Sequence, residues 1–518
     1  MLSDRSANRS RNGKRVNRAR TFWLAGLAGA ALPLALAPFD LWPLSLISVA
    51  VLFRVLDDAR GTRAAFLGWA FGVGKYGVGA SWIYVSIHDY GPAPVWLAAS
   101  MVAVFVFAMA WFPAAFTFAY VRWLRGPNRW VNAIGFSACW VALEWALTWV
   151  LTGFPWLFLG YAHLEDPLRH FAPVGGVLLV SLVAALSATL AVAPIARDAT
   201  QRALTIGVLV ALVPWLVGFS LGYAQWVEPG SEGRVALVQG NIQQDVKWRP
   251  ESVAPILDRY RTLSAPYWRR DLVIWPEAAV TLFEQEATPF IEEMAARAGR
   301  GGAALVFGVP GYERLPDGDV MFRNMAAVVG NGSGHYIKRR LVPFGEYVPL
   351  ENVLRGAIEF FDLPMSHAGS GPITQPLLRA GRWRLATEIC YEVVYPDMVR
   401  RDARDADVIV TISNDSWFGH SIGPHQHLQM VRMRAIENGR YVLRATNNGV
   451  TAIIAPSGAV VARAPQFEPT VLDGTFSGMI GVTPYGAWGH LPVLVLVIIG
   501  AGISLVFRRQ IRRGVRVR

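Results

Sequence analysis

The sequence predicts a multi-pass α-helical membrane domain joined to a soluble α/β domain, and three observations support this fold class. Hydrophobic residues make up 53% of the 518 residues and charged residues 17%, and the mean hydropathy of +0.32 is too high for an ordinary soluble protein. Seven long apolar runs fill residues 21–226, and an eighth lies within residues 486–507. Residues 227–485 instead carry short apolar runs separated by Gly, Pro and Asn, a pattern typical of strands that alternate with helices.

The apolar runs predict eight membrane spans. Most of them approach or exceed the roughly 20 residues that a helix needs to cross a bilayer, although the second run is short. The runs occupy residues 21–37, 42–56, 64–87, 93–122, 130–151, 171–195, 203–225 and 489–507. The first run follows a basic tail at residues 1–20 and ends in Ala35-Leu36-Ala37, as a signal peptide does. Because further spans follow at once, we expect an uncleaved first helix.

Basic residues between the runs predict the orientation of the chain. The tail at residues 1–20 carries seven Lys or Arg, the tail at residues 508–518 carries six, and every second connection between runs is also basic. The other connections hold a single basic residue, Arg169. By the positive-inside rule, both tails face the cytoplasm and residues 227–485 lie on the extracytoplasmic side. The net charge of +12 therefore suits a bilayer surface and does not indicate nucleic acid.

Two ionisable residues fall inside predicted spans, Lys75 and Glu144. Charge at membrane depth is costly, so such residues are usually functional or paired with each other. The alternative is that each lies near an interface and extends its charged group towards water.

Residues 227–485 read as one α/β domain of strands and helices in alternation. Strands are predicted at residues 235–238, 272–275, 304–307, 326–329, 382–390, 408–412, 441–444 and 451–454, with helices at 250–265, 287–299, 395–403 and 425–437. Three reactive side chains fall at strand ends in this domain: Glu277, Lys338 and Cys390. The only other cysteine, Cys139, lies in an apolar run and is predicted to pack there, so no disulfide framework is expected.

A carboxylate, an ammonium and a thiol at three strand ends would form a complete site for acyl transfer. The carboxylate of Glu277 can take the proton of the Cys390 thiol, and the ammonium of Lys338 can stabilise the oxyanion that forms when the thiolate attacks a carbonyl. Taken singly, each residue has a more ordinary interpretation, as a small buried side chain, a surface ion pair or a solvated charge.

The segments around these residues resemble the three motifs of the nitrilase superfamily. They are Trp275-Pro276-Glu277, Lys338 with Leu341-Val342-Pro343-Phe344-Gly345-Glu346, and Glu388-Ile389-Cys390-Tyr391-Glu392. A domain of this kind after seven spans and before an eighth resembles the apolipoprotein N-acyltransferase family in particular. The segments 238–242, Lys247-Trp248 and 413–419 also match that family, and the resemblance covers essentially the whole chain.

This resemblance implies an α-β-β-α sandwich and a ping-pong acyltransferase with a Glu277–Lys338–Cys390 triad. The enzyme would move an acyl chain from the sn-1 position of a phospholipid to Cys390, and then from this thioester to the α-amine of the diacylglyceryl-cysteine at the N-terminus of an apolipoprotein. The implied location is a bacterial inner membrane, with the catalytic domain on the periplasmic face. The partners are the phospholipid donor, the apolipoprotein acceptor and the bilayer, and we expect a monomer.

The resemblance also implies supporting roles for Glu346, Tyr391 and Glu392, which are otherwise ordinary polar residues of turns. Three aromatic residues are expected to contact the acyl chain or headgroup, or merely to lie at the membrane interface: Trp248, Trp417 and Phe418. The segment 359–365 is expected to form a lid, a membrane-dipping loop or a buried connector. His425 and His427 lack a third ligand, so neither a metal nor a cofactor is predicted.

Two other functions compete with this interpretation. A membrane-anchored amidase or nitrilase acting on a small carbon–nitrogen substrate would use the same triad, but it has no use for seven preceding spans. A receptor or transporter with a degenerate outer domain would not need to keep all three reactive residues.

Overall fold

The computed structural model describes residues 18–91, 93–195, 200–315, 320–343, 345–347 and 368–514, with side chains as far as residue 510. Most of the predicted basic tail, the segment 359–365 and the last C-terminal residues lie outside this part of the chain. The chain divides into a helical unit, within Met1–Tyr84, Val95–Ala224 and His490–Arg518, and a sheet unit, Val85–Pro94 with Gln225–Gly489. The short segment Val85–Pro94 therefore groups with the sheet unit, although the prediction assigned it to the membrane domain.

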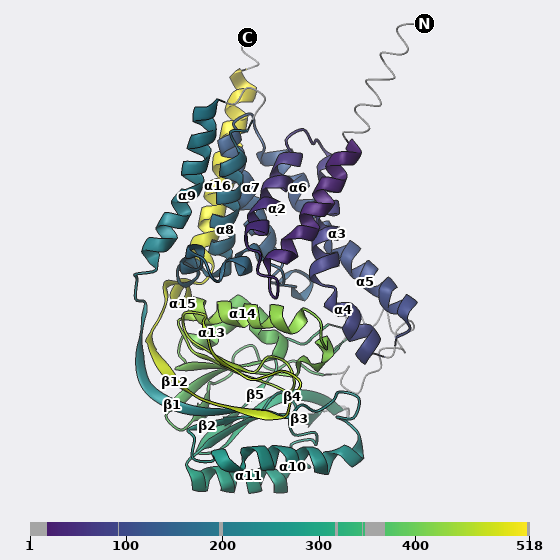
Figure 1. Cartoon of the computed structure of the whole chain (residues 1–518), viewed down its shortest axis with the longest axis vertical. Coiled ribbons are helices and arrows are strands. Elements are labelled where there is room, and N and C mark those ends of the chain that lie inside the picture. The colour runs from purple at the N-terminus through teal and green to yellow at the C-terminus, as the bar shows by residue number, and fades with distance from the viewer. Residues whose placement is uncertain are drawn as a thin grey trace. The chain divides into compact units, whose positions relative to one another are not determined.

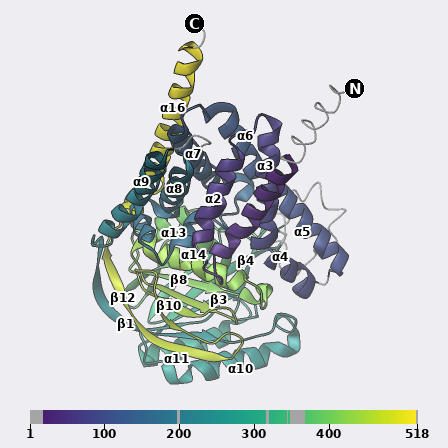
Figure 2. The same ribbon diagram turned by 45° about the horizontal axis from the view of Figure 1, so that its top comes forward.

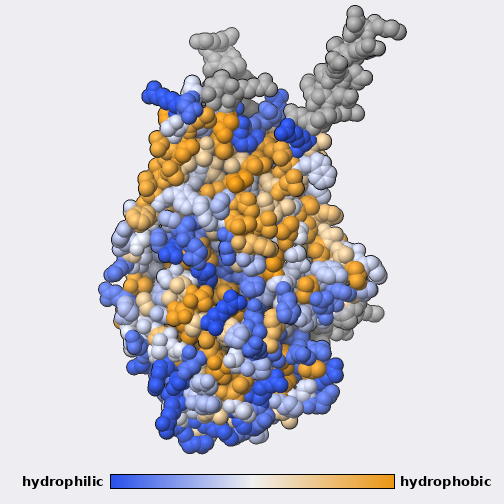
Figure 3. Space-filling model, viewed as in Figure 1, coloured by the Kyte–Doolittle hydropathy of each residue, from blue (hydrophilic) through white to orange (hydrophobic). Residues whose placement is uncertain are grey.

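The helical unit is built from the apolar runs of the sequence (Figure 1). Its main helices are residues 18–31, α2 (Pro43–Val55), α3 (Thr62–Gly79), α5 (Val95–Met109), α6 (Trp111–Ala119), α7 (Arg129–Ala146), α8 (Ala172–Val192), α9 (Gln201–Leu221) and α16 (Leu491–Gly514). Its surface is largely hydrophobic, whereas that of the sheet unit is mostly hydrophilic (Figure 3). Such a surface is stable only against lipid, so the predicted multi-pass membrane domain is confirmed as a fold class.

Four helical stretches among the described residues are long and apolar enough to cross a membrane. They are Val95–Leu124, Pro167–Val192, Gln201–Leu221 and Leu491–Gln510, and α2 is apolar but shorter. The count of eight spans stays a prediction. Small residues allow some helices to pack tightly: a Cβ on Gly68 of α3 would lie 2.4 Å from the main-chain oxygen of Pro113 on α6.

The two ionisable residues singled out within the predicted spans are both buried inside the helical unit. Lys75 is 2% exposed and Glu144 is 1% exposed, so neither side chain reaches towards water. The Lys75 ammonium lies 5.7 Å from the centre of the Trp140 ring, and Trp140 Nε1 donates to Glu144 Oε1 at 2.9 Å. The two residues thus share a buried tryptophan, and the alternative that they extend to an interface is wrong.

The sheet unit carries its strands in one continuous order that folds into two facing halves (Figures 1 and 2). One half is β12-β1-β2-β3-β4-β5 and the other is β6-β7-β8-β9-β10-β11. The strands are β1 (Val227–Gln239), β2 (Leu272–Ile274), β3 (Ala304–Arg314), β4 (Val320–Gly330), β5 (Gly332–Ile337), β6 (Leu378–Ala380), β7 (Trp383–Ile389), β8 (Val408–Ser413), β9 (Val442–Thr446), β10 (Ala452–Ile454), β11 (Val460–Arg463) and β12 (Thr470–Gly481). At the centre of each half the strands run parallel, β1-β2-β3 and β7-β8-β9.

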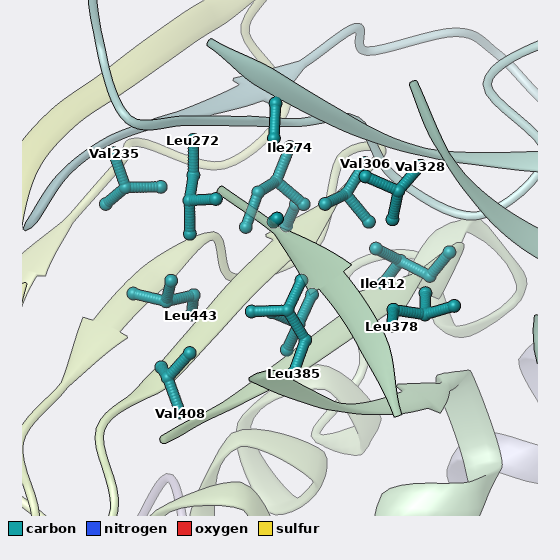
Figure 4. Packing of buried hydrophobic residues seen from close by; sticks show 14 of the residues in the cluster. Val235, Leu272, Ile274, Val306, Val328, Leu378, Leu385, Val408, Ile412 and Leu443 are labelled. Atoms are coloured by element: carbon teal, nitrogen blue, oxygen red, sulfur yellow. The ribbon is translucent and has the colours of Figure 1, made fainter. Parts of the chain in front are cut away.

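Apolar side chains from both halves meet in a shared core (Figure 4). Val235, Leu272 and Ile274 from the first half face Leu385 and Leu443 from the second, and all five are fully buried. The outer face of the first half is covered by α10 (Val253–Ser264) and α11 (Thr288–Gly301), and that of the second by α13 (Pro396–Ala403) and α14 (Gly423–Asn438) (Figure 1). This arrangement is the α-β-β-α sandwich that the sequence predicted.

Candidate active site

Glu277 is held at the carboxyl end of the parallel strand β2. Trp275 anchors the segment, since its ring is 1% exposed in the core and its Nε1 donates to Ser264 Oγ at 2.8 Å. Three residues later the chain turns sharply at Ala278, whose φ of +47° is rare for a residue with a side chain. The backbone here lies directly on β3, because a Cβ on Gly308 would be 2.7 Å from the Glu277 Cα.

Lys338 follows directly after β5 and is 1% exposed. Its main-chain N–H donates to the carbonyl of Asn324 on β4 at 2.8 Å, which continues the strand pairing as far as the lysine. Its Nζ lies 3.1 Å from Glu277 Oε1 and 2.9 Å from Glu346 Oε1. The Asn324 side chain donates to the same two carboxylate oxygens at 2.8 and 2.9 Å. We call Glu277, Asn324, Lys338 and Glu346 the ion-paired cluster.

Cys390 lies at the first position after β7, where a short 3₁₀ helix begins (Cys390–Val394). The prediction ended the strand at Cys390, but the strand ends at Ile389 because Cys390 has a φ of +55°. This left-handed conformation turns the chain away from the sheet, and such strain is common where a side chain must be presented for reaction. The residue remains partly accessible.

The charges of the ion-paired cluster act on Cys390 and on one another. Burial raises the pKa of Glu277, but the Lys338 ammonium and the Asn324 amide outweigh it, so this pKa lies below its usual value. Burial lowers the pKa of Lys338, and the carboxylates of Glu277 and Glu346 reverse this and raise it well above its usual range. Burial and then the Glu277 carboxylate raise the pKa of the Cys390 thiol. The resting site therefore holds a carboxylate, an ammonium and a neutral thiol.

Glu392 ties the turn of Cys390 to the segment that carries Lys338. Its Oε2 accepts from the Ile389 N–H at 2.8 Å and from the Tyr336 hydroxyl at 2.9 Å. Its Oε1 accepts from the N–H groups of Arg339 and Arg340 at 2.6 and 3.1 Å. One buried carboxylate thus fixes the ends of β5 and β7 relative to each other.

Glu392 also belongs to a second cluster of buried carboxyl groups. Glu388 is fully buried, and Arg339 Nη2 lies 3.9 Å from its Oε2 while pairing more closely with Asp402. Burial and then Asp402 and Glu392 raise the pKa of Glu388 well above its usual value. Burial raises the pKa of Glu392 to about 6. We call Arg339, Glu388, Glu392 and Asp402 the acidic cluster.

The remaining sequence-predicted residues lie around this centre. Tyr391 is mostly buried and its ring meets that of Tyr395 edge-on, 5.3 Å between centroids. Trp248 is half-buried, with its ring 5.8 Å from Lys247 Nζ. Trp417 is half-buried too, its main-chain oxygen accepting from Ser86 Oγ at 2.8 Å. Phe418 packs edge-on against His427, 6.1 Å between ring centres.

His427 contacts the backbone of Cys390. Its Nε2 lies 3.2 Å from the main-chain oxygen of Cys390, which accepts from it. Its Nδ1 lies 3.1 Å from both Asp415 Oδ1 and Arg444 Nη2. Arg444 also pairs with Asp415 Oδ2 at 2.6 Å. Burial and then Arg444 lower the pKa of His427, and they outweigh the Asp415 carboxylate, which raises it. Among the described residues, no group of three or more His, Cys, Asp or Glu side chains is placed to hold a metal ion.

Two groups of this site were not singled out in the sequence: the side chain of Asn324, and the main-chain N–H of Asn414, which donates to Glu277 Oε2 at 2.9 Å. His427 was considered only as a metal ligand, and Lys247 was named only as part of a family match. Lys247 is 1% exposed and its Nζ donates to the main-chain oxygen of Glu277 at 3.2 Å. Scarcity could have drawn attention to Lys247, because only four of the 49 basic residues are lysines.

Comparison with known proteins first defines the class of the sheet unit. Residues 234–485 match the family model described as carbon-nitrogen hydrolase. Residues 28–190 match the model described as the apolipoprotein N-acyltransferase N-terminal domain. The apolipoprotein N-acyltransferase of Pseudomonas aeruginosa strain PAO1 is 47% identical over 494 residues, 94% of this chain and 96% of the relative. That of Azotobacter vinelandii strain DJ is 47% identical over 496 residues, 94% and 95% of the two chains.

The chain therefore belongs to the apolipoprotein N-acyltransferase family, and it is an acyltransferase of a bacterial membrane. Two solved structures each match about half of this chain at low TM-scores. The Caenorhabditis elegans (C. elegans) NitFhit protein has a TM-score of 0.37 at 15% identity, covering 54% of this chain and 65% of its own. An amidase from Nesterenkonia sp. AN1 has a TM-score of 0.36 at 19% identity, covering 52% and 98%.

Proposed function

We propose that this enzyme transfers an acyl chain from the sn-1 position of a phospholipid to the α-amine of the diacylglyceryl-cysteine at the N-terminus of an apolipoprotein. The observation that carries the proposal is the convergence of Glu277, Lys338 and Cys390 at three strand ends of a carbon–nitrogen hydrolase domain. The reaction is ping-pong, with the acyl chain held on Cys390 as a thioester between the two substrates.

In the first half-reaction the Cys390 thiol attacks the ester carbonyl of the phospholipid. Glu277 takes the thiol proton as the carbon–sulfur bond forms, since its low pKa keeps it ionised in the resting site. Lys338 Nζ and the Tyr391 main-chain N–H hold the oxyanion of the tetrahedral intermediate. When the carbon–oxygen bond breaks, Glu277 returns the proton to the leaving lysophospholipid.

In the second half-reaction the neutral α-amine of the lipoprotein attacks the thioester carbonyl. Glu277 takes a proton from the attacking nitrogen, the carbon–sulfur bond breaks, and the Cys390 thiolate regains that proton. An amide and a free thiol result, so no atom is left over and the mechanism needs no cofactor. Glu346 holds Lys338 in place for both halves, and Glu392 holds the turn of Cys390.

The architecture is consistent with these substrates. Both carry long acyl chains and reside in a bilayer, which explains a helical membrane unit in an enzyme whose chemistry belongs to the sheet unit. We assign the sheet unit to the extracytoplasmic face and both termini to the cytoplasm, on the distribution of basic residues. Trp248, Trp417 and Phe418 are assigned to contacts with the acyl chain or headgroup.

The acyl-enzyme provides the direct test. Purified protein incubated with phospholipid should gain the mass of one acyl group, the Cys390→Ala variant should gain none, and the Cys139→Ala control should be acylated as the unchanged protein is. A diacylated lipopeptide added to the acyl-enzyme should gain a third chain on its α-amine. Release of free fatty acid alone would instead favour a hydrolase, and an adduct that persists in Cys390→Ala would refute the nucleophile.

A further inference from the structure

The feature that the proposed mechanism leaves unused is a second buried lysine beside Glu277. Lys247 lies in the connection between β1 and α10, far from Lys338 in sequence, yet both lysines are 1% exposed. Its Nζ donates to the main-chain oxygen of Glu277, 3.2 Å away. Lys247 therefore contacts the backbone of the general base, whereas Lys338 contacts its carboxylate.

The two lysines differ in how their charge is balanced. Lys338 has two carboxylates at 3.1 and 2.9 Å. No residue in the described part of the chain places a carboxylate oxygen within 4.0 Å of Lys247 Nζ. Its other close neighbour is the face of the Trp248 ring, 5.8 Å from centroid to nitrogen. An unpaired buried ammonium is costly, so a folded enzyme that keeps one usually gains function from it.

The hydrogen bond of Lys247 acts on a strained part of the backbone. The carbonyl of Glu277 belongs to the peptide that leads into Ala278, the residue with a φ of +47°. The preceding carbonyl, that of Pro276, accepts from the Gly308 N–H of β3 at 3.2 Å. Lys247 and β3 thus hold the two peptides that flank the Cα of Glu277, and this fixes the direction in which its side chain leaves the backbone.

The charge of Lys247 acts on the reacting groups as well. Burial lowers the pKa of Lys247 to about 8, and the charges of Glu277 and of a Cys390 thiolate act in the opposite direction. Such an interaction is reciprocal: if a Cys390 thiolate favours the charged form of Lys247, then a charged Lys247 favours the thiolate. The positive charge is present at neutral pH and is lost as the pH rises through about 8.

We propose that Lys247 is a positioning residue for the acylation of Cys390, which fixes the main-chain carbonyl of Glu277 and supplies a second positive charge to the pocket where the thiolate forms. The proposal rests on the proposed function, since it takes Glu277 as the base and Cys390 as the nucleophile. Lys247 exchanges no atom with the substrate. Proton transfer from Cys390 to Glu277, and the bonds that form and break, remain as described above.

The test is the pH dependence of the rate at which the protein, incubated with phospholipid vesicles, forms the acyl-enzyme. Between pH 6 and pH 10 this rate should fall as Lys247 loses its proton. Lys247→Met should lower the rate at neutral pH by up to about 100-fold, as displaced catalytic groups do, and should abolish the alkaline fall. Lys247→Arg keeps its charge at every pH used, so the fall in its rate should shift to higher pH or disappear. This variant should also retain more activity than Lys247→Met.

Arg249→Met provides the matched control, because it removes a positive charge two residues away at an exposed position. It should leave both the rate and the pH profile unchanged. If Lys247→Met is acylated at the unaltered rate, or keeps the alkaline fall, the inference is wrong. If Lys247→Met does not fold, the shift in Lys247→Arg still decides the question. A protein that forms no adduct on Cys390 at any pH would instead refute the proposed function itself.

Discussion

The ion-paired cluster and the acidic cluster both lie near the turn at Cys390, and both contain buried carboxyl groups. The pKa of a carboxyl is nevertheless lowered in the first cluster and raised in the second. In the first, Glu277 and Glu346 share the Lys338 ammonium and the Asn324 amide, and the pKa of Glu277 is lowered. In the second, Glu388 and Asp402 share the single guanidinium of Arg339, and the pKa of Glu388 is raised well above its usual value.

The comparison shows that burial alone does not decide whether a carboxyl is charged. Burial raises the pKa in both clusters, and the difference comes from the number of cations and N–H donors for each carboxyl. Glu392 lies between the extremes: it accepts from three main-chain N–H groups and a hydroxyl, and its pKa is raised only to about 6. A general base must be ionised before it can act, so a buried base requires a counter-ion.

The largest effect is expected from removing the cation of the ion-paired cluster. Lys338→Met should lower the rate of acyl-enzyme formation about 100- to 1,000-fold, because it removes an oxyanion donor. It should also raise the pKa of Glu277, since burial is then opposed by fewer charges. The acylation rate of the unchanged protein should not fall as the pH is lowered to 5. The residual rate of Lys338→Met should instead fall with decreasing pH already above pH 4.5, the ordinary pKa of a glutamate.

Intact-mass kinetics at a series of pH values would measure both effects. Arg340→Met is the control, because it removes an exposed positive charge two residues away. If Lys338→Met had the same acid dependence as the unchanged protein, the ammonium would not be what keeps Glu277 ionised.

An intermediate effect is expected at Glu392, whose carboxylate accepts hydrogen bonds with both oxygens. Glu392→Gln turns one acceptor into a donor that faces N–H or O–H groups, which costs about 1–3 kcal/mol for a buried group. The melting temperature should fall, and acylation should slow by about 10- to 100-fold because the turn of Cys390 is less well held. Calorimetry and the acylation assay in detergent would show this, with Glu286→Gln as a surface control for the same chemical change. A stable variant with full activity would show that the tie between β5 and β7 is dispensable.

Much of this arrangement could be predicted from the sequence, and the failures have physical causes. The apolar runs located the central strands, and the motifs located Glu277, Lys338 and Cys390, because each lies within three residues of the end of a strand. Asn324 was missed because it lies within β4, where nothing nearby in the sequence indicates a role. Its hydrogen bond to Glu277, 47 residues away in the chain, is visible only in the structure. The left-handed conformations of Ala278 and Cys390 were missed because neither residue type indicates a positive φ.

Contacts between distant segments account for the other gaps. His427 lies 37 residues from Cys390, and Arg444 another 17 from His427, so no local pattern connects them. The two histidines of that segment raised the question of a metal, but His427 instead donates to a carbonyl. The predicted strand ranges lack β5, β6, β11 and β12, because these strands are short or largely exposed and no regular apolar pattern marks them.

The smallest effect, and the sharpest test of the comparison, is expected at Glu388. In the described residues no N–H group lies within hydrogen-bond distance of either of its oxygens. Burial raises its pKa and so favours the neutral acid in the folded protein, and an amide of the same shape should replace it well. Glu388→Gln should therefore keep the acylation rate within about threefold, since it removes no charge from the folded site.

The stability of Glu388→Gln should depend on pH in a defined direction. In the unfolded chain Glu388 ionises near pH 4.5, whereas in the folded protein it holds its proton to a much higher pH. The folded state thus binds the proton more tightly, and the stability from this group is full below pH 4.5 and lost as the pH rises towards the folded pKa. Glutamine does not titrate, so the Glu388→Gln variant does not lose this stability as the pH rises. The melting temperature of the variant minus that of the unchanged protein should therefore be more positive at pH 8 than at pH 5. If this difference in melting temperature were equal at the two pH values, or if the activity fell as much as in Glu392→Gln, Glu388 would be ionised. The carboxyls of the two clusters would then not differ in charge.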